Sequence, residues 1–197
     1  MIMDHYFDIR LLPDADFTAP VLLNALYTKL HRVLVLQQET GIGVSFPLYQ
    51  AASENAEGQK LHAHFGLTLR LHGDKETLTR LMDTRWLRGF VDYTMTGNIL
   101  PVPKDAHLIR VIRRQTKGRP DKERARLMRR KGLSESEAAQ LISNRPAPKL
   151  NWPFITLDSV STGQRFLLFI EQTAAAQHAQ GTFNAYGLSQ TATLPAW

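Results

Sequence analysis

The segment LHAHFGLTLRLH, residues 61–72, decides the fold of this 197-residue chain. Its odd positions are apolar and its even positions are mostly polar, a pattern typical of a β-strand with one buried and one solvent-facing side. This alternation places His62, His64 and His72 on the solvent-facing side. A turn follows, and Asp74 is well placed to cap a short helix after it.

The flanking sequence completes a β-α-β-β-α-β series. Residues 5–11 and 42–46 alternate as strands do, and residues 90–95 supply a last strand. Residues 21–36 repeat their leucines and valines at three- and four-residue steps, which indicates a helix. The polar region 50–60 is predicted to be a surface loop. This order of elements is that of a ferredoxin-like unit, an antiparallel sheet with two helices on one face.

The step Pro101-Val102-Pro103 marks a predicted domain boundary. We predict an α+β chain with a ferredoxin-like domain over residues 1–100 and a smaller α+β domain over residues 101–197. The elements expected in the second domain are a strand at 107–115, a helix at about 119–131, a helix opened by a capping box at Ser134, paired strands at 154–157 and 165–171, and a short strand at 183–188.

The positive charge is concentrated in one segment. The whole chain carries a net charge of +6, whereas residues 104–131 hold twelve lysines and arginines against three acidic residues, so the rest of the chain is slightly acidic. Clustering of this kind is typical of a site for a polyanion. A membrane surface is a poorer match, because the basic helix lacks an apolar face. A face that is merely solvated is the simpler alternative, although such faces usually mix glutamate with lysine.

The basic helix and the strand before it predict contacts with a folded nucleic acid. A helical turn of 100° per residue groups Lys122, Arg126, Arg129 and Arg130 on one side. Just upstream, Arg113 and Gln115 would point the same way on an extended segment, and their side chains can pair with the edges of guanine and adenine respectively. Because side chains do not reach into the deep major groove of a long RNA duplex, a short hairpin is the better partner.

Composition excludes several kinds of chemistry. The chain has no cysteine, which removes disulfides, thiolate metal sites and cysteine nucleophiles. It has no secretory signal and no membrane span, so we expect a cytoplasmic protein without a membrane partner. The pair His62 and His64 lacks further metal donors, and motifs for phosphate loops or metal hydrolases are absent. We therefore expect no metal and no cofactor.

Histidine is the natural candidate for proton transfer near neutral pH. His31 lies in the middle of the first predicted helix, next to a long apolar run. A surface position on that helix is the simpler interpretation of this residue alone. Ser159, Ser161 and Tyr186 lie near the ends of predicted strands, where each is by itself most simply a turn or edge residue.

Four motifs, taken together, resemble a known family. They are IGVSFP at 42–47, RLMRR at 126–130, STGQRFLLFI at 161–170 and YGLS at 186–189. In this order and spacing they resemble the CRISPR repeat-specific endoribonuclease of subtype I-F systems. The resemblance covers almost the whole chain. Arg114, Ala125 and Lys131 depart from it, and the loop 49–60 matches it poorly.

The resemblance implies an activity and a set of roles. The enzyme would cut CRISPR precursor RNA beside each repeat hairpin, keep the crRNA and enter the subtype I-F surveillance complex with other subunits, itself a monomer. His31 matches the catalytic histidine, Ser159 the serine that holds the attacking 2′-hydroxyl and Tyr186 the tyrosine that restrains the histidine. RNA contacts are implied for Arg113, Gln115, Arg126, Arg129, Arg130, Ser161 and Phe166, the last of which would stack under the closing base pair.

The implied reaction needs no metal, because RNA carries its own nucleophile. Attack of the 2′-hydroxyl on the adjacent phosphate, with His31 as general base, gives a 2′,3′-cyclic phosphate and a 5′-hydroxyl. Two other functions remain open on the residues alone. One is a structured-RNA-binding protein without catalysis, and the other is a DNA-binding regulator with the basic helix in a B-form groove.

Overall fold

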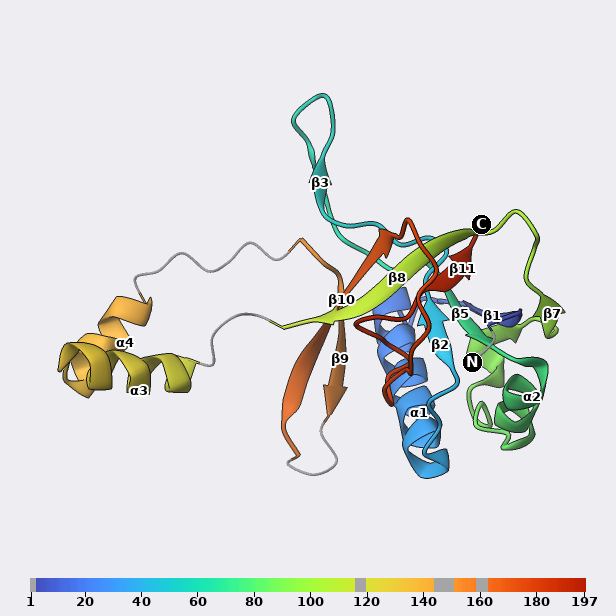
Figure 1. Cartoon of the computed structure of the whole chain (residues 1–197), viewed down its shortest axis with the longest axis horizontal. Helices are drawn as coiled ribbons and strands as arrows, with labels where there is room; N and C mark the ends of the chain where they lie inside the picture. The colour runs from blue at the N-terminus through green and yellow to red at the C-terminus, as the bar shows by residue number, and fades with distance from the viewer. Residues whose placement is uncertain (1–2, 116–119, 144–150, 159–162) are drawn as a thin grey trace. The chain divides into compact units, whose positions relative to one another are not determined.

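The computed structural model describes residues 3–115, 120–143, 151–158 and 163–197 (Figure 1). The chain divides into two compact units. The larger is built from Met1–Arg114 and Asn151–Trp197, and the smaller is Gln115–Leu150. Among the described residues, no helix has the length and apolar character that crossing a membrane requires.

The first sheet of the larger unit has the strand order β2-β5-β1-β6, with antiparallel neighbours throughout. Its central strand β1 (His5–Leu11) pairs with β5 (Thr68–Gly73) on one side and with β6 (Thr94–Thr96) on the other. The remaining strands are β2 (Gly43–Ser45), which pairs with β5, and β7 (Leu100–Pro101), which pairs with the start of β1.

Two helices complete the predicted β-α-β-β-α-β series. Helix α1 (Ala19–Gln37) has Pro20 in its first turn, where the missing N–H costs nothing, and ends at Gln38 in the left-handed conformation. Helix α2 (Lys75–Asp83) is capped as predicted, since the Asp74 carboxylate accepts a hydrogen bond from the backbone N–H of Thr77. A short 3₁₀ turn, η1 (Val91–Tyr93), precedes β6 and replaces the start of the predicted strand at 90–95.

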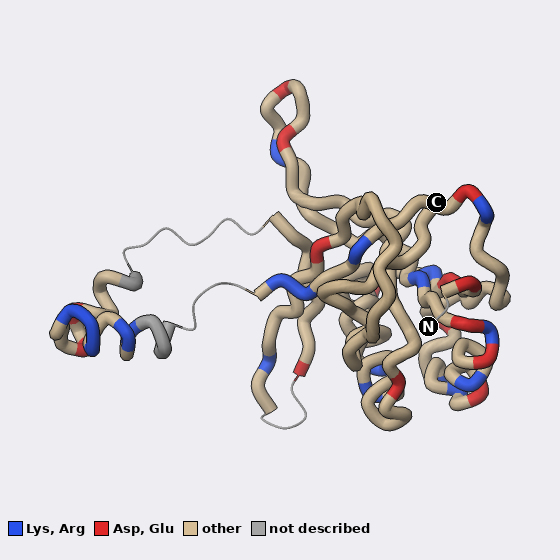
Figure 2. Tube along the Cα trace, viewed as in Figure 1, with Lys and Arg blue, Asp and Glu red and all other residues tan. Residues whose placement is uncertain are grey.

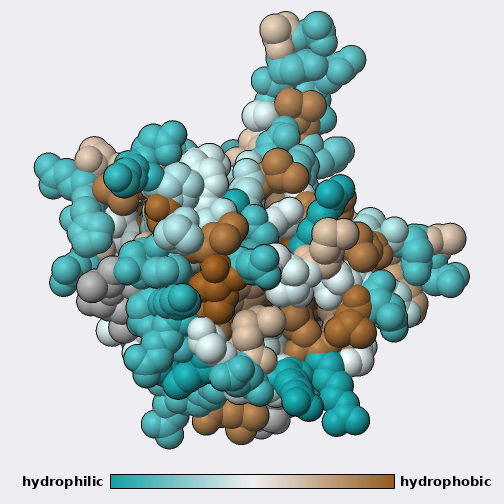
Figure 3. Space-filling model, turned by 90° about the vertical axis from the view of Figure 1, so that its right-hand side faces the viewer, coloured by the Kyte–Doolittle hydropathy of each residue, from teal (hydrophilic) through white to brown (hydrophobic). Residues whose placement is uncertain are grey.

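The segment 61–72 is not one strand. Its regular part begins at Thr68, because Gly66 has a φ of +73° and a Cβ there would lie 2.4 Å from that of Leu48. The predicted loop before it contains a hairpin of β3 (Ser53–Glu54) and β4 (Lys60–Leu61). The hairpin stands away from the sheets and carries mostly hydrophilic residues (Figures 1 and 3).

Other parts of the chain cover the side of β5 that the alternating pattern predicts to face solvent. The Cζ atom of Arg70 lies 3.8 Å from the ring of Trp197 and 4.6 Å from the ring of Tyr6. The Asp8 carboxylate accepts two hydrogen bonds from the same guanidinium. His72 is therefore fully buried, and its predicted solvent-facing position is wrong because the end of the chain packs over this strand.

The second sheet belongs to the same unit. Its order is β11-β8-β10-β9, again antiparallel throughout. The strands are β8 (His107–Arg114), β9 (Phe154–Asp158), β10 (Arg165–Ala174) and β11 (Leu194–Ala196). Residues 183–188 form a turn instead of the predicted final strand, whose place is taken by β11.

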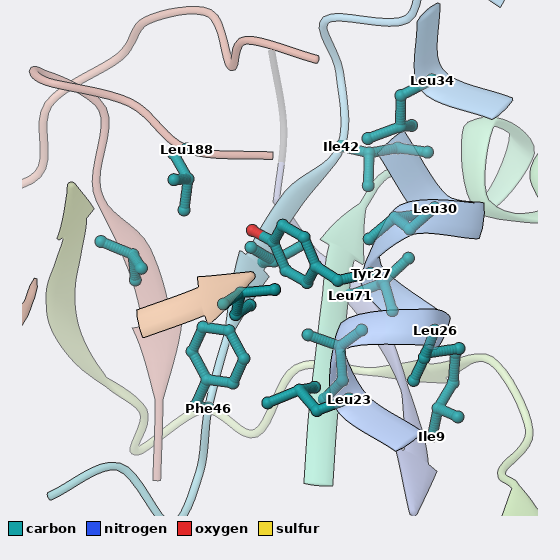
Figure 4. Packing of buried hydrophobic residues seen from close by; sticks show 14 of the residues in the cluster. Ile9, Leu23, Leu26, Tyr27, Leu30, Leu34, Ile42, Phe46, Leu71 and Leu188 are labelled. Atoms are coloured by element: carbon teal, nitrogen blue, oxygen red, sulfur yellow. The ribbon is translucent and has the colours of Figure 1, made fainter. Parts of the chain in front are cut away.

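Both sheets contribute to one hydrophobic core with α1. Figure 4 shows Tyr27 and Leu30 of α1 among the core residues, together with Phe46 and Leu188 from other parts of the chain. Because β8–β11 share this core, the larger unit continues past residue 100, where the sequence predicted a domain boundary.

The smaller unit is a pair of helices, as predicted. Helix α3 (Pro120–Lys131) carries the clustered basic residues and α4 (Glu135–Ser143) packs on it (Figure 2). The predicted capping box is present, because the Ser134 N–H donates to the Glu137 carboxylate at 2.8 Å and the Glu137 N–H donates to the Ser134 hydroxyl at 3.3 Å.

Candidate active site

His31 is held by a backbone carbonyl from the other end of the chain. Its Nδ1 lies 2.8 Å from the carbonyl oxygen of Ala185. Since a carbonyl oxygen only accepts hydrogen bonds, Nδ1 must carry the proton. The neutral ring therefore presents Nε2 with a free lone pair. This is the tautomer that a general base requires.

Tyr186 fixes the plane of the same ring. The rings of His31 and Tyr186 are stacked, with centroids 4.2 Å apart and planes inclined by 13°. Both side chains are half-buried, so each keeps access to solvent. The dipeptide Ala185-Tyr186 thus sets both the tautomer of the histidine and the orientation of its ring.

A tight turn presents this dipeptide. The Asn184 side-chain oxygen accepts hydrogen bonds from the N–H groups of Tyr186 and Leu188. Gly187 has a φ of +68°, and a Cβ at this position would lie 2.7 Å from a methyl carbon of Val44. The Gly187 carbonyl also accepts a hydrogen bond from the Val44 N–H at 2.9 Å. The YGLS motif therefore encodes a turn fastened to β2.

Phe166 and Arg113 border the His31–Tyr186 pair. The ring of Phe166, on β10, meets the ring of Tyr186 edge to face at a centroid distance of 6.5 Å. The Arg113 guanidinium carbon lies 5.8 Å from the centroids of both rings. Four of the residues predicted from the sequence, on α1, β8, β10 and the 184–188 turn, are thus neighbours.

Arg114, which departs from the resemblance, faces the other way. Its guanidinium donates to the Glu171 carboxylate at 2.7 Å, and the indole N–H of Trp152 donates to the same carboxylate at 2.9 Å. Successive residues of a strand point to opposite sides of its sheet. Arg113 therefore lies on the core side with Phe166, while the charge of Arg114 is paired on the outer side.

The remaining predicted residues are placed only in part. Ser159 and Ser161 lie outside the described residues, as does the side chain of Lys122. Gln115 is exposed and begins the smaller unit. On α3, the side chains of Arg126, Arg129 and Arg130 are all exposed.

The paired histidines of the predicted strand lie elsewhere. His62 and His64 are exposed, and Nε2 of His64 lies 3.1 Å from the Gln50 side-chain oxygen. Within the described ranges, no three His, Asp or Glu side chains gather closely enough to hold a metal ion.

Tyr27 and Asn184 are site residues that the sequence interpretation missed. Asn184 shapes the turn, and the Tyr27 hydroxyl donates to the Tyr186 carbonyl at 2.6 Å. A signal for Tyr27 was present, because it stands one helical turn before His31 and so lies on the same side of the helix. The spacing of Asn184 ahead of Tyr-Gly is likewise that of a side chain that bonds the backbone two residues on.

Known proteins of similar sequence show the family to which this chain belongs. A family model described as CRISPR-associated protein (Cas_Csy4) matches residues 6–197. The chain belongs to the Cas_Csy4 family. The resemblance seen in the four sequence motifs is thereby confirmed.

Two relatives of the Cas_Csy4 chain are similar over nearly their whole length. A protein of Pseudomonas aeruginosa (strain UCBPP-PA14) is 40% identical over 194 residues, which cover 98% of this chain and 99% of the relative. A protein of Escherichia coli (strain UTI89 / UPEC) is 35% identical with the same coverage. Both relatives are named CRISPR-associated endonuclease Cas6/Csy4.

Proposed function

We propose that this chain is an endoribonuclease that cleaves CRISPR precursor RNA at the base of the repeat hairpin, with His31 as the general base. The observation that carries the proposal is the Nδ1–H tautomer of His31, fixed by the Ala185 carbonyl at 2.8 Å. Membership of a family whose relatives are named CRISPR-associated endonucleases supports the same activity and substrate.

The reaction uses a nucleophile that the substrate itself carries. Nε2 of His31 takes the proton of the 2′-hydroxyl, and the resulting oxygen attacks the adjacent phosphorus in line. The bond from O2′ to phosphorus forms as the bond from phosphorus to O5′ breaks, the leaving oxygen takes up a proton from water, and His31 returns its proton to solvent. The products are a 2′,3′-cyclic phosphate and a 5′-hydroxyl. No metal enters this scheme, since base and nucleophile are both accounted for.

The other predicted residues receive roles in the same scheme. Ser159 holds the 2′-hydroxyl, and Tyr186 keeps the His31 ring in plane. Phe166 stacks under the closing base pair, which its half-buried ring beside Tyr186 would allow. Arg113 and Gln115 read bases at the foot of the stem, with Ser161 as a supporting contact.

The basic helix α3 binds the stem of the RNA hairpin. Arg126, Arg129 and Arg130, together with Lys122, line the groove and neutralise phosphates. Three of these side chains are exposed, and α3 ends in Arg129, Arg130 and Lys131. As the family resemblance implies, the protein retains the crRNA and joins the other subunits of the surveillance complex as a single copy.

A cleavage assay with modified substrates tests the proposal. We expect an end-labelled repeat hairpin from the neighbouring CRISPR array to be cut once, in EDTA as well as in magnesium, leaving a 2′,3′-cyclic phosphate. A hairpin with a single 2′-deoxy nucleotide before the cleavage site should bind equally and stay intact. Cleavage of the deoxy substrate, or a strict metal requirement, would refute the scheme, and binding without any cleavage would indicate a non-catalytic RNA-binding protein.

A further inference from the structure

Two side chains of α1 donate hydrogen bonds to two consecutive backbone carbonyl groups of the same turn. His31 Nδ1–H donates to the Ala185 carbonyl at 2.8 Å, and the Tyr27 hydroxyl donates to the Tyr186 carbonyl at 2.6 Å. Tyr27 and His31 are four residues apart, so they lie one above the other on one side of the helix. The helix thus holds the Ala185-Tyr186 dipeptide at two points, one turn apart.

Packing alone does not explain why residue 27 carries a hydroxyl group. The side chain is fully buried, and its ring is stacked on that of Phe46 at 6.3 Å within the core. A phenylalanine would fill most of the same space, whereas a buried hydroxyl is costly unless it finds a partner. Burial, with a smaller contribution from neighbouring Tyr186, raises the pKa of Tyr27 well above its ordinary value. The hydroxyl therefore remains a donor at every pH at which cleavage is measured.

The hydrogen bond from Tyr27 completes the fixation of Tyr186. The Asn184 side chain already holds the N–H of Tyr186, and Tyr27 holds its carbonyl, so both polar groups of that backbone unit are bonded to side chains. The ring that leaves this fixed backbone is the one stacked on His31. Movement of the Tyr186 carbonyl would also rotate the adjoining Ala185 peptide, which accepts the Nδ1–H bond.

We infer that Tyr27 is a positioning residue for RNA cleavage: its hydroxyl fixes the Ala185-Tyr186 backbone, which in turn holds the tautomer and ring plane of His31. The inference rests on the proposed function, because it assigns Tyr27 to the reaction that His31 performs. Tyr27 is buried beneath the pair and is not a group that touches RNA.

The test compares Tyr27→Phe with the loss of another tyrosine hydroxyl, that of the partly buried Tyr49. Tyr49→Phe removes another tyrosine hydroxyl that donates to a backbone carbonyl, that of Ile170 at 3.3 Å, without touching the 184–188 turn. We expect Tyr27→Phe to slow single-turnover cleavage roughly three- to tenfold, the factor of one ordinary hydrogen bond, and to leave hairpin affinity unchanged. Tyr49→Phe should cleave at the wild-type rate.

A nuclear magnetic resonance measurement on the full chain supplies a readout that lost stability alone would not move. The ring ¹⁵N shifts of His31 should show the Nδ1–H tautomer in the wild type and in Tyr49→Phe, and a mixture of tautomers in Tyr27→Phe. Replacement of Tyr27 by 4-aminophenylalanine, which keeps a donor, should restore both the tautomer and the rate. This donor variant keeps the inference testable if the phenylalanine variant folds poorly.

The outcomes separate this inference from the proposed function. A wild-type tautomer and wild-type rate in Tyr27→Phe would overturn the positioning role while leaving cleavage by His31 intact. Equal losses in Tyr27→Phe and Tyr49→Phe would also overturn it, since they would indicate a general effect on the core. If the wild type itself fails to cut the hairpin, the proposed function fails, yet the ¹⁵N shifts still decide whether Tyr27 sets the tautomer.

Discussion

His31 and Tyr186 are 155 positions apart in the sequence, yet their rings are stacked with centroids 4.2 Å apart and planes inclined by only 13°. The residue before Tyr186 accepts the Nδ1–H bond of the same histidine. One dipeptide therefore controls two properties of the His31 ring, its protonated nitrogen and its orientation. Enzymes gain rate from this kind of preorganisation because the reacting groups need not search for their geometry.

Removing the imidazole should remove catalysis and leave recognition intact. We expect His31→Ala to lower the single-turnover cleavage rate by about 10²- to 10⁴-fold, the usual contribution of a general base. Hairpin affinity, measured by filter binding, should stay close to that of the wild type. The exposed His178 provides the control, since His178→Ala should cleave normally. A His31→Ala protein that cleaves at full rate would show that the base lies elsewhere.

The stacked ring of Tyr186, and not its hydroxyl, should carry the restraint on His31. We expect Tyr186→Phe to cleave at nearly the wild-type rate, and Tyr186→Ala to be slower by roughly fivefold, because an aromatic pair contributes about 1 kcal/mol beyond its buried area. The measurement is single-turnover cleavage at saturating protein. Equal losses in both variants would move the role from the ring to the hydroxyl.

Two adjacent arginines should differ sharply in their effect on RNA. Arg113 lies beside Phe166 and Tyr186, whereas Arg114 is paired with Glu171 on the opposite side of the strand. We expect Arg113→Ala to weaken hairpin binding by about 1–3 kcal/mol and to relax the preference for bases at the foot of the stem. Arg114→Ala should leave affinity and base preference unchanged. Equal losses in the two variants would contradict the assignment of Arg113 to base recognition.

Local sequence patterns predicted most helices and strands, but they did not predict which residues are buried by distant segments of the chain. The capping box at Ser134 and the Asp74 cap depend on residues three positions apart, so the sequence contains their whole cause. The burial of His72 depends on Trp197 at the far end of the chain, which alternation within one strand cannot reveal. The alternating pattern includes Gly66 as one more position of a strand, although its left-handed conformation ends the regular pairing there.

In the candidate site, too, the contacts between distant segments could not be predicted from local sequence. The sequence identified His31 and Tyr186 only through motifs shared with a family, since nothing in either neighbourhood implies that a helix and a turn meet. Tyr27 and Asn184 act through backbone atoms, and a side chain that bonds to a carbonyl of a distant segment leaves no complementary residue type to look for. Their contribution became visible only in the folded chain.

The basic helix should govern the salt dependence of RNA binding. We expect the triple replacement of Arg126, Arg129 and Arg130 by alanine to flatten the plot of log affinity against log salt by up to roughly one unit per lost phosphate contact. The control is Lys75→Ala, which removes one exposed charge from α2 in the other unit. An unchanged slope in the triple variant would remove α3 from the RNA interface.

His72 should make the fold sensitive to acid. The ring is fully buried and shares a hydrogen bond of 2.8 Å with the Ser45 hydroxyl. Burial, and to a smaller extent the charge of Arg70, lower the pKa of His72 to about 3. The same side chain in the unfolded chain has the ordinary pKa of about 6.5. Between these two values the unfolded state binds a proton that the folded state does not.

The sign of the effect follows from that difference. Protons favour the state that binds them, so the free energy of unfolding is unaffected by His72 above about pH 6.5 and falls as the pH drops toward about 3, by at most about 1.4 kcal/mol per pH unit. We expect His72→Gln, which keeps a polar group near Ser45 but does not titrate, to flatten the loss of stability measured by urea unfolding between pH 7 and pH 4. His178→Gln, at an exposed position, should retain the wild-type profile. If the His72→Gln profile is as steep as that of the wild type, His72 does not cause the acid sensitivity. The loss of stability would then come from carboxylates that bind protons more readily in the unfolded state than in the folded state.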